Sequence, residues 1–149
     1  MSSGKTHDYI SSFCTIPFTV ALSQIYPAHA ATATAGYTLG WLILSPDLDL
    51  PQSRPSQRWL IFSPLWWPYQ KTHRHRGFSH WPLFGSAERL LYVAVFGYAA
   101  WAIARHFGWT GAAPLDLQSW RSLFALYAGV ESACLLHLFC DYCPGLRRL

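Results

Sequence analysis

Long apolar runs separated by polar, proline-rich segments form the pattern of this chain. Residues 9–46 contain no Asp, Glu, Lys or Arg, and at ~1.5 Å per residue this length is enough for two short helices. A break is expected at residues 27–29, and the second helix is predicted over residues 30–44. Gly36 and Gly40 in this second helix have the spacing of small residues that permits close packing against another helix.

Two further helices are predicted in the second half of the chain. The hydrophobic pattern places them at residues 82–107 and 117–141, with a turn at residues 108–114. The whole chain, residues 1–149, is short enough to form one domain. We therefore expect a single all-α domain, built as a four-helix, up-down bundle.

The middle of the chain interrupts this helical pattern. Proline recurs five times between residues 46 and 68, and such recurrence is typical of turns and loops. The segment between residues 47 and 80 is therefore predicted to be a long irregular loop between the second and third helices. Its residues 59–67 are expected to form an aromatic stretch lying on the surface.

Composition favours a membrane setting for this bundle. Hydrophobic residues make up 52% of the chain and charged residues only 12%, while 17% of the residues are aromatic and thus suited to membrane–water interfaces. With four spans, the N-terminus, the middle loop and the C-terminus lie on one side. Most of the positive charge falls there: Lys5, Arg54, Arg58, Lys71, Arg74, Arg76, Arg147 and Arg148.

This asymmetry predicts a multi-pass membrane protein with both termini in the cytoplasm, because positive loops stay on that side. Anionic lipid headgroups are the expected partners, and no nucleic-acid motif accompanies the positive residues. The alternative is a soluble helical protein. It is favoured by the short uncharged run of residues 90–104, by Glu131 within the fourth helix and by a modest mean hydropathy of +0.14.

The candidate chemistry lies at the ends of the predicted helices. An up-down bundle would bring these ends together, and with them seven candidate metal ligands. His137 and Asp141 are four residues apart and share a helical face. Carboxylates combined with imidazoles suit zinc, manganese or iron better than calcium or magnesium, and one or two ions are expected. The candidate ligands are His7, Asp47, Asp49, His75, His80, His137 and Asp141.

Each ligand also has a simpler interpretation when it is taken alone. His137 could be a hydrogen-bonded core histidine, Asp141 a helix-end carboxylate, and Asp47 the cap of a turn. The sequence also leaves open whether His73 or His75 binds the metal. These simpler interpretations lose weight together, because all the candidates coincide at one end of the predicted bundle.

Three motifs in order resemble the YdjM-like membrane-bound, metal-dependent hydrolases. They are Ser-Pro-Asp-Leu-Asp-Leu-Pro from residue 45, His-Arg-Gly-Phe-Ser-His from residue 75, and His-Leu-Phe-Cys-Asp from residue 137. A related group of small metal-binding membrane proteins from cyanobacteria and archaea is similar as well. More distantly, the arrangement resembles the all-helical zinc-dependent phospholipase C and single-strand nuclease superfamily. Leu50 and Trp81 depart from the family pattern, where histidine and serine are usual.

We therefore predict a membrane-bound hydrolase of phosphoesters, with a lipid headgroup ester as a possible substrate. In this hypothesis a metal-activated water attacks phosphorus, Asp49 accepts its proton, and Arg76 holds the phosphoryl oxygens. The alternative is a non-catalytic membrane protein whose metal is structural or sensory, or which serves as an assembly subunit.

Overall fold

The fold is all-α, as predicted. The computed structural model describes residues 4–111 and 120–143, and no strand occurs in these two ranges. The predicted second, third and fourth helices agree with the observed ones to within about three residues wherever they are described. Residues 117–119 of the predicted fourth helix and residues 112–114 of the predicted turn lie outside the described residues. The long helices are α1 (Gly4–Ile25), α2 (Ala30–Leu42), α5 (Phe84–His106) and α6 (Trp120–Tyr142), with η1 (Pro27–His29) between the first two.

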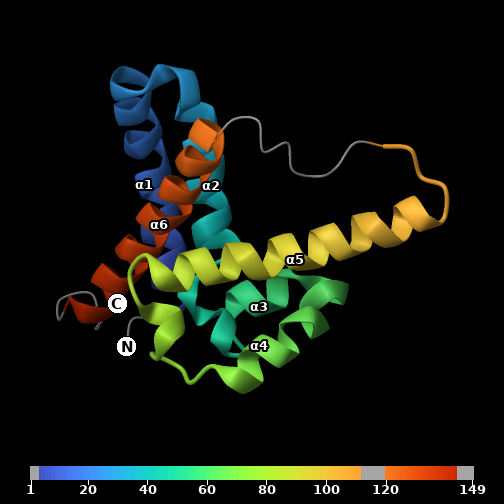
Figure 1. The fold of residues 1–149 in the computed structure, drawn as a ribbon. Helices are drawn as coiled ribbons and strands as arrows, with labels where there is room; N and C mark the ends of the chain where they lie inside the picture. Colours follow the sequence, from blue (N-terminus) through green and yellow to red (C-terminus); the bar gives the residue numbers. More distant parts are fainter. Residues whose placement is uncertain (1–3, 112–119, 144–149) are drawn as a thin grey trace.

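Helices α1, α2 and α6 pack together along their lengths (Figure 1). Glycines bring α2 and α6 into close contact. A Cβ atom added to Gly36 would lie 2.2 Å from the carbonyl oxygen of Leu126, and one added to Gly129 would lie 2.0 Å from that of Ala33. A Cβ atom added to Gly40 would lie 2.8 Å from Ala133 Cβ and 2.9 Å from the carbonyl oxygen of Val130. The close packing predicted for Gly36 and Gly40 is therefore confirmed, and the partner is α6.

Helix α5 does not complete an up-down bundle of four helices. It lies across one end of the other three long helices and extends beyond them (Figure 1). Gly85, Ser86 and Arg89, all in its first two turns, are its buried residues. The prediction of a four-helix bundle is corrected in this respect. The physical reason is that the middle segment folds and packs against α5, through Trp66 and Tyr92.

The middle segment is not irregular. It forms short helices, and prolines lie in the first turn of three of them, where the missing N–H group costs no hydrogen bond. The recurrent prolines thus begin helices rather than prevent them, which corrects the prediction of a loop. The segment contains η2 (Pro46–Asp49), α3 (Arg54–Arg58), η3 (Leu60–Trp66), α4 (Trp67–Thr72) and η4 (Phe78–His80).

The hydrophobic core lies where this segment meets α6. Trp66 and Tyr69 are almost fully buried, and they belong to one cluster with Leu48 and Val130. The predicted surface position of residues 59–67 is therefore wrong for Trp66. Exposed side chains elsewhere in that stretch, such as Ile61 at 83% exposure, fit the prediction.

Two helices of the described residues, α5 and α6, are long and apolar enough to cross a membrane. The most apolar part of α5 has 6% of its residues buried within the protein, and that of α6 has 44%. Helix α2 has 13 residues, which at ~1.5 Å per residue gives about 20 Å, short of the ~30 Å hydrocarbon layer. Four membrane-spanning helices are therefore not confirmed.

Candidate metal centre

All seven predicted ligands lie at one end of the α1–α2–α6 group. His7 is in the first turn of α1, and Asp47 and Asp49 are in η2. His137 and Asp141 are in the last turns of α6. His75 and His80 come from the turn after α4 and from η4. None of the seven residues belongs to α5, of which only the first turns are buried.

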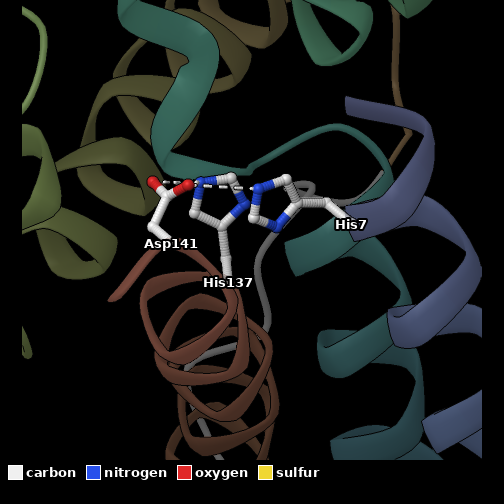
Figure 2. Close-up of side chains that lie close together, drawn as sticks. All are labelled: His7, His137 and Asp141. Carbon is white, nitrogen blue, oxygen red and sulfur yellow. Dashed lines mark ion pairs between the residues drawn. The ribbon is translucent and has the colours of Figure 1, made fainter. Parts of the chain in front are cut away.

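The first of two groups consists of His7, His137 and Asp141, all buried (Figure 2). His7 Nε2 lies 3.2 Å from Asp141 Oδ1, and His137 Nε2 lies 3.7 Å from Asp141 Oδ2. The two imidazole rings are stacked, with centroids 4.1 Å apart. Helices from opposite ends of the sequence thus present two nitrogens and a carboxylate to a common point.

The second group consists of Asp47, His75 and His80. His80 Nε2 lies 3.7 Å from Asp47 Oδ1, and the His75 and His80 rings are perpendicular with centroids 5.1 Å apart. The same Asp47 oxygen lies 3.5 Å from His137 Nε2. Asp47 therefore joins the two groups into one continuous cluster.

The carboxylate of Asp49 faces the Nδ1 atoms of two histidines, His75 and His80. Its Oδ1 is 3.0 Å from His75 Nδ1, and its Oδ2 is 3.6 Å from His80 Nδ1. Ser79 Oγ donates a hydrogen bond to Oδ2 at 2.9 Å. A carboxylate in contact with Nδ1 fixes the orientation of an imidazole and leaves Nε2 available for a metal. Asp49 is thus placed to orient ligands.

Ser45 has the same relation to His137. Its Oγ lies 3.4 Å from His137 Nδ1. The three histidines His75, His80 and His137 consequently have their Nδ1 atoms facing a polar partner. Their Nε2 atoms are buried and, within the described parts of the chain, make no hydrogen bond.

This pattern fits a divalent metal ion. A buried polar atom without a hydrogen bond is costly, and most such atoms have a partner. Donor separations of 3.2–3.7 Å match the ~3.3 Å between neighbouring ligands of a tetrahedral ion with bonds of about 2.0–2.1 Å. Imidazole nitrogens and carboxylate oxygens are also ligands that zinc accepts.

Electrostatics favour the ionised form of Asp47. Burial raises the pKa of its carboxyl group, but the adjacent imidazoles of His137 and His80 lower it, as does the charge of His7. The net effect holds the pKa of Asp47 well below its usual range. Asp47 is therefore a carboxylate at neutral pH, the form that binds a cation.

The structure brings His75 rather than His73 into the cluster. His73 Nε2 lies 2.8 Å from Glu88 Oε1, its Nδ1 lies 2.9 Å from the Tyr69 carbonyl oxygen, and its ring stacks on Tyr69. Both nitrogens of His73 are therefore engaged away from the other ligands.

Arg76, expected to hold phosphoryl oxygens, is exposed and has left-handed backbone geometry with φ of 63°. Among the residues described, it makes no hydrogen bond or ion pair with the cluster. The structure does not bring it together with the predicted ligands.

Arg89 is the residue that sequence reasoning missed. Its fully buried guanidinium donates to the carbonyl oxygens of Leu44 at 2.9 Å and Ser79 at 2.6 Å, and its Nη2 lies 3.1 Å from Cys134 Sγ. Leu44 directly precedes the segment with Ser45 and the Asp47 ligand, and Ser79 precedes the ligand His80. Arg89 thus holds two ligand segments together. The available signal was a charged residue, adjacent to Glu88, near the start of an otherwise apolar helix.

A cavity of about 500 Å³ opens beside His7, Asp47 and His137. Lys5 and Arg54 also line it. The cluster is therefore accessible from this side to water and to a small ligand.

The architecture and this site define an all-α protein with a buried His/Asp cluster suited to a metal. Residues 2–147 match the sequence profile of the family described as "Uncharacterized metal-binding protein (DUF2227)". The chain belongs to this family. The match agrees with the predicted similarity to small metal-binding proteins, and it lends no support to the YdjM-like hydrolases.

A protein from Aquifex aeolicus (strain VF5), described as "Uncharacterized protein", is 50% identical over 58 residues. The matching region covers 39% of this chain and 41% of that protein. The chain thus matches about two fifths of the length of this relative. No solved structure matches the chain.

Proposed function

We propose that the cluster binds two divalent transition-metal ions, zinc being the best fit and manganese or iron the alternatives. His7, His137 and Asp141 would hold one ion, and His75 and His80 the other, with Asp47 within reach of both. Asp49 and Ser45 would orient the imidazoles from the Nδ1 side. The observation that carries this proposal is the set of buried Nε2 atoms facing one carboxylate.

We further propose that the centre hydrolyses phosphoesters. The cavity beside His7, Asp47 and His137 supports this step, because a purely structural site is usually closed by protein ligands. Bound divalent ions lower the pKa of water and polarise phosphoryl oxygens. Asp49 and Ser45 would position the metal-binding imidazoles. The burial of His80 and His137 would limit the access of water to their side of the centre. Both oxygens of Asp49 are engaged by His75 and Ser79, so a positioning role suits it better than proton transfer.

Turnover of bis(para-nitrophenyl) phosphate by the purified full chain, loaded with zinc or manganese, tests this proposal. We expect hydrolysis that Asp47→Ala abolishes and Glu88→Gln leaves unchanged, since Glu88 pairs with His73 outside the cluster. Absence of turnover in fully metal-loaded protein would overturn the hydrolase proposal.

A non-catalytic role is the second candidate function. It is supported by the family description, which states metal binding and no reaction. It is also supported by the burial of five of the seven predicted ligands: His7, Asp49, His80, His137 and Asp141. In this case the metal stabilises the junction of α1, η2, η4 and α6, for a structural, sensory or assembly role. Full metal occupancy with no turnover, together with a large rise in melting temperature on metal binding, would favour it.

We also propose that α5 contacts the lipid bilayer in a membrane protein whose termini face the cytoplasm. Support comes from the length of α5 and from exposed apolar side chains such as Leu91, Val95 and Ile103. The positive residues near the ligand end favour the cytoplasmic side. Retention of the protein in carbonate-washed membranes is expected. Recovery in the soluble fraction without detergent would contradict this proposal.

A further inference from the structure

The cavity beside the cluster has two chemically different walls. His7, Asp47 and His137 form one wall, and they are the ligands through which the cavity meets the proposed metal centre. Lys5 and Arg54 also line it, from the start of α1 and from α3. The volume of about 500 Å³ lies within the range of small-molecule sites.

Positive charge exceeds negative charge on the second wall. Asp8 pairs with Arg54 and also with Arg58, whose Nη2 lies 2.6 Å from Asp8 Oδ2. Asp8 itself lines the cavity, and its one carboxylate thus faces two guanidinium groups, of which only that of Arg54 lines the cavity. Lys5 adds a second positive charge to the lining. This wall therefore keeps an excess of positive charge, which favours an anion in the cavity when bound metal ions neutralise Asp47 on the other wall.

The two arginines differ in what they can still bind. Arg58 also donates to the Leu42 carbonyl oxygen at 3.0 Å and lies over the Trp41 ring, so it is committed to the protein. Arg54 lines the cavity with its side chain 46% exposed, and its one described hydrogen bond is made by Nη1 to Asp8. A guanidinium has five N–H donors, so Arg54 retains donors for an incoming anion.

We propose that this cavity is a binding site for a phosphate group, held by Arg54 and Lys5, which line the cavity together with the imidazoles of His7 and His137. This inference rests on the proposed function, since the phosphate would lie between the basic wall and the metal ligands. A phosphate group presents oxygens in tetrahedral directions, so it can contact both walls at once, and guanidinium matches its geometry. In this proposal Arg54 and Lys5, rather than Arg76, hold the phosphoryl oxygens.

Calorimetric titration of the metal-loaded full chain with inorganic phosphate tests the inference. Arg54→Met should weaken phosphate binding by about 10- to 100-fold, the range for losing hydrogen bonds to a charged group. Lys5→Met should weaken it by a smaller factor. Arg76→Met is the matched control, because Arg76 is an exposed arginine outside the cavity, and it should leave phosphate binding unchanged. Metal content should be equal in all four proteins.

Arg54→Met also removes a partner of Asp8, so Lys5→Met keeps the test decisive if the first variant folds poorly. Equal phosphate affinity in wild type and Lys5→Met, or a loss in Arg76→Met as large as in Arg54→Met, would overturn the inference. Acetate binding as tightly as phosphate would also overturn it, because the proposed site requires a tetrahedral anion.

Two further arms identify the source of the phosphate group. Phosphatidylcholine vesicles containing phosphatidic acid should displace inorganic phosphate if a lipid headgroup is the ligand, and pure phosphatidylcholine vesicles should not. Displacement by para-nitrophenyl phosphate, without displacement by vesicles, would indicate a soluble phosphoester. Arg54-dependent phosphate binding without turnover supports this site and rejects hydrolysis. Turnover that is unchanged in Arg54→Met and Lys5→Met supports hydrolysis and rejects this phosphate site.

Discussion

Helices α5 and α6 have the same length, 23 residues, and both are apolar enough to cross a membrane, yet they are used differently. Helix α6 packs closely against α2 and ends in two ligands of the metal cluster. Helix α5 is buried in its first two turns and exposes most of its apolar surface beyond them.

Small residues account for much of this difference. Gly129 of α6 contacts the α2 backbone so closely that a Cβ atom would not fit, whereas a Cβ atom at Gly97 of α5 would meet nothing within 4 Å. Hydrophobicity alone therefore does not determine which helix is packed. Helix α6, which carries two of the metal ligands, is the helix whose glycine lets the backbone of α2 approach closely.

The largest expected effect is that of Gly129→Val. Its Cβ would lie 2.0 Å from the Ala33 carbonyl oxygen, and overpacking against a backbone atom should lower the free energy of unfolding by about 3 kcal/mol or more. Chemical unfolding followed by circular dichroism measures it. Gly97→Val in α5 is the control and should change stability by less than about 0.5 kcal/mol. Equal losses for the two variants would contradict the contrast between the helices.

Arg89→Met should have the next largest effect, because it leaves the carbonyl oxygens of Leu44 and Ser79 without their donor. We expect a loss of about 2–3 kcal/mol in unfolding free energy. Metal affinity should fall as well, since the two ligand segments are no longer held together. Arg105→Met, at the exposed end of α5, is the matched control. Unchanged metal affinity in folded Arg89→Met would refute the positioning role.

Asp49→Asn should act on metal affinity more than on folding. Replacing a carboxylate that orients metal-binding imidazoles typically costs about 10- to 100-fold in affinity. Competition with a chromophoric chelator measures the change for zinc. Glu88→Gln, which alters the carboxylate paired with His73, should leave zinc affinity unchanged. A complete loss of metal in Asp49→Asn would instead indicate that Asp49 is itself a ligand.

The smallest effect on the folded protein is expected for Ile103→Gln on α5. Ile103 is 60% exposed, so the unfolding free energy should change by less than about 0.5 kcal/mol. Metal content should also be unchanged. Retention in carbonate-washed membranes should decrease, because a polar side chain on this surface disfavours contact with lipid. Unchanged retention would show that α5 is not the part that contacts the membrane.

The sequence predicted the long helices well, because long apolar stretches and glycine spacing are local signals. It also indicated which residues gather at the ligand end, since each lies at the end of an element. The short helices of the middle segment were missed, because a proline such as Pro55 can begin a helix or interrupt one.

Other features depend on tertiary contacts that no local pattern specifies. The crossing of α5 is set by its packing on Trp66, and the role of Asp49 depends on which imidazole nitrogens face it. Arg89 could be interpreted only once the carbonyl groups of Leu44 and Ser79 were placed around it. The exposed position of Arg76 likewise follows from the turn that contains it.

Metal content per chain, measured by elemental analysis of the purified protein, tests the central claim most directly. The account predicts about two ions in wild type, and about one each in His7→Ala and His75→Ala, because these residues belong to different groups. Asp47→Ala should lower occupancy of both positions, since Asp47 faces His80 and His137 alike. Wild-type protein without metal, or His7→Ala and His75→Ala with undiminished metal content, would contradict it.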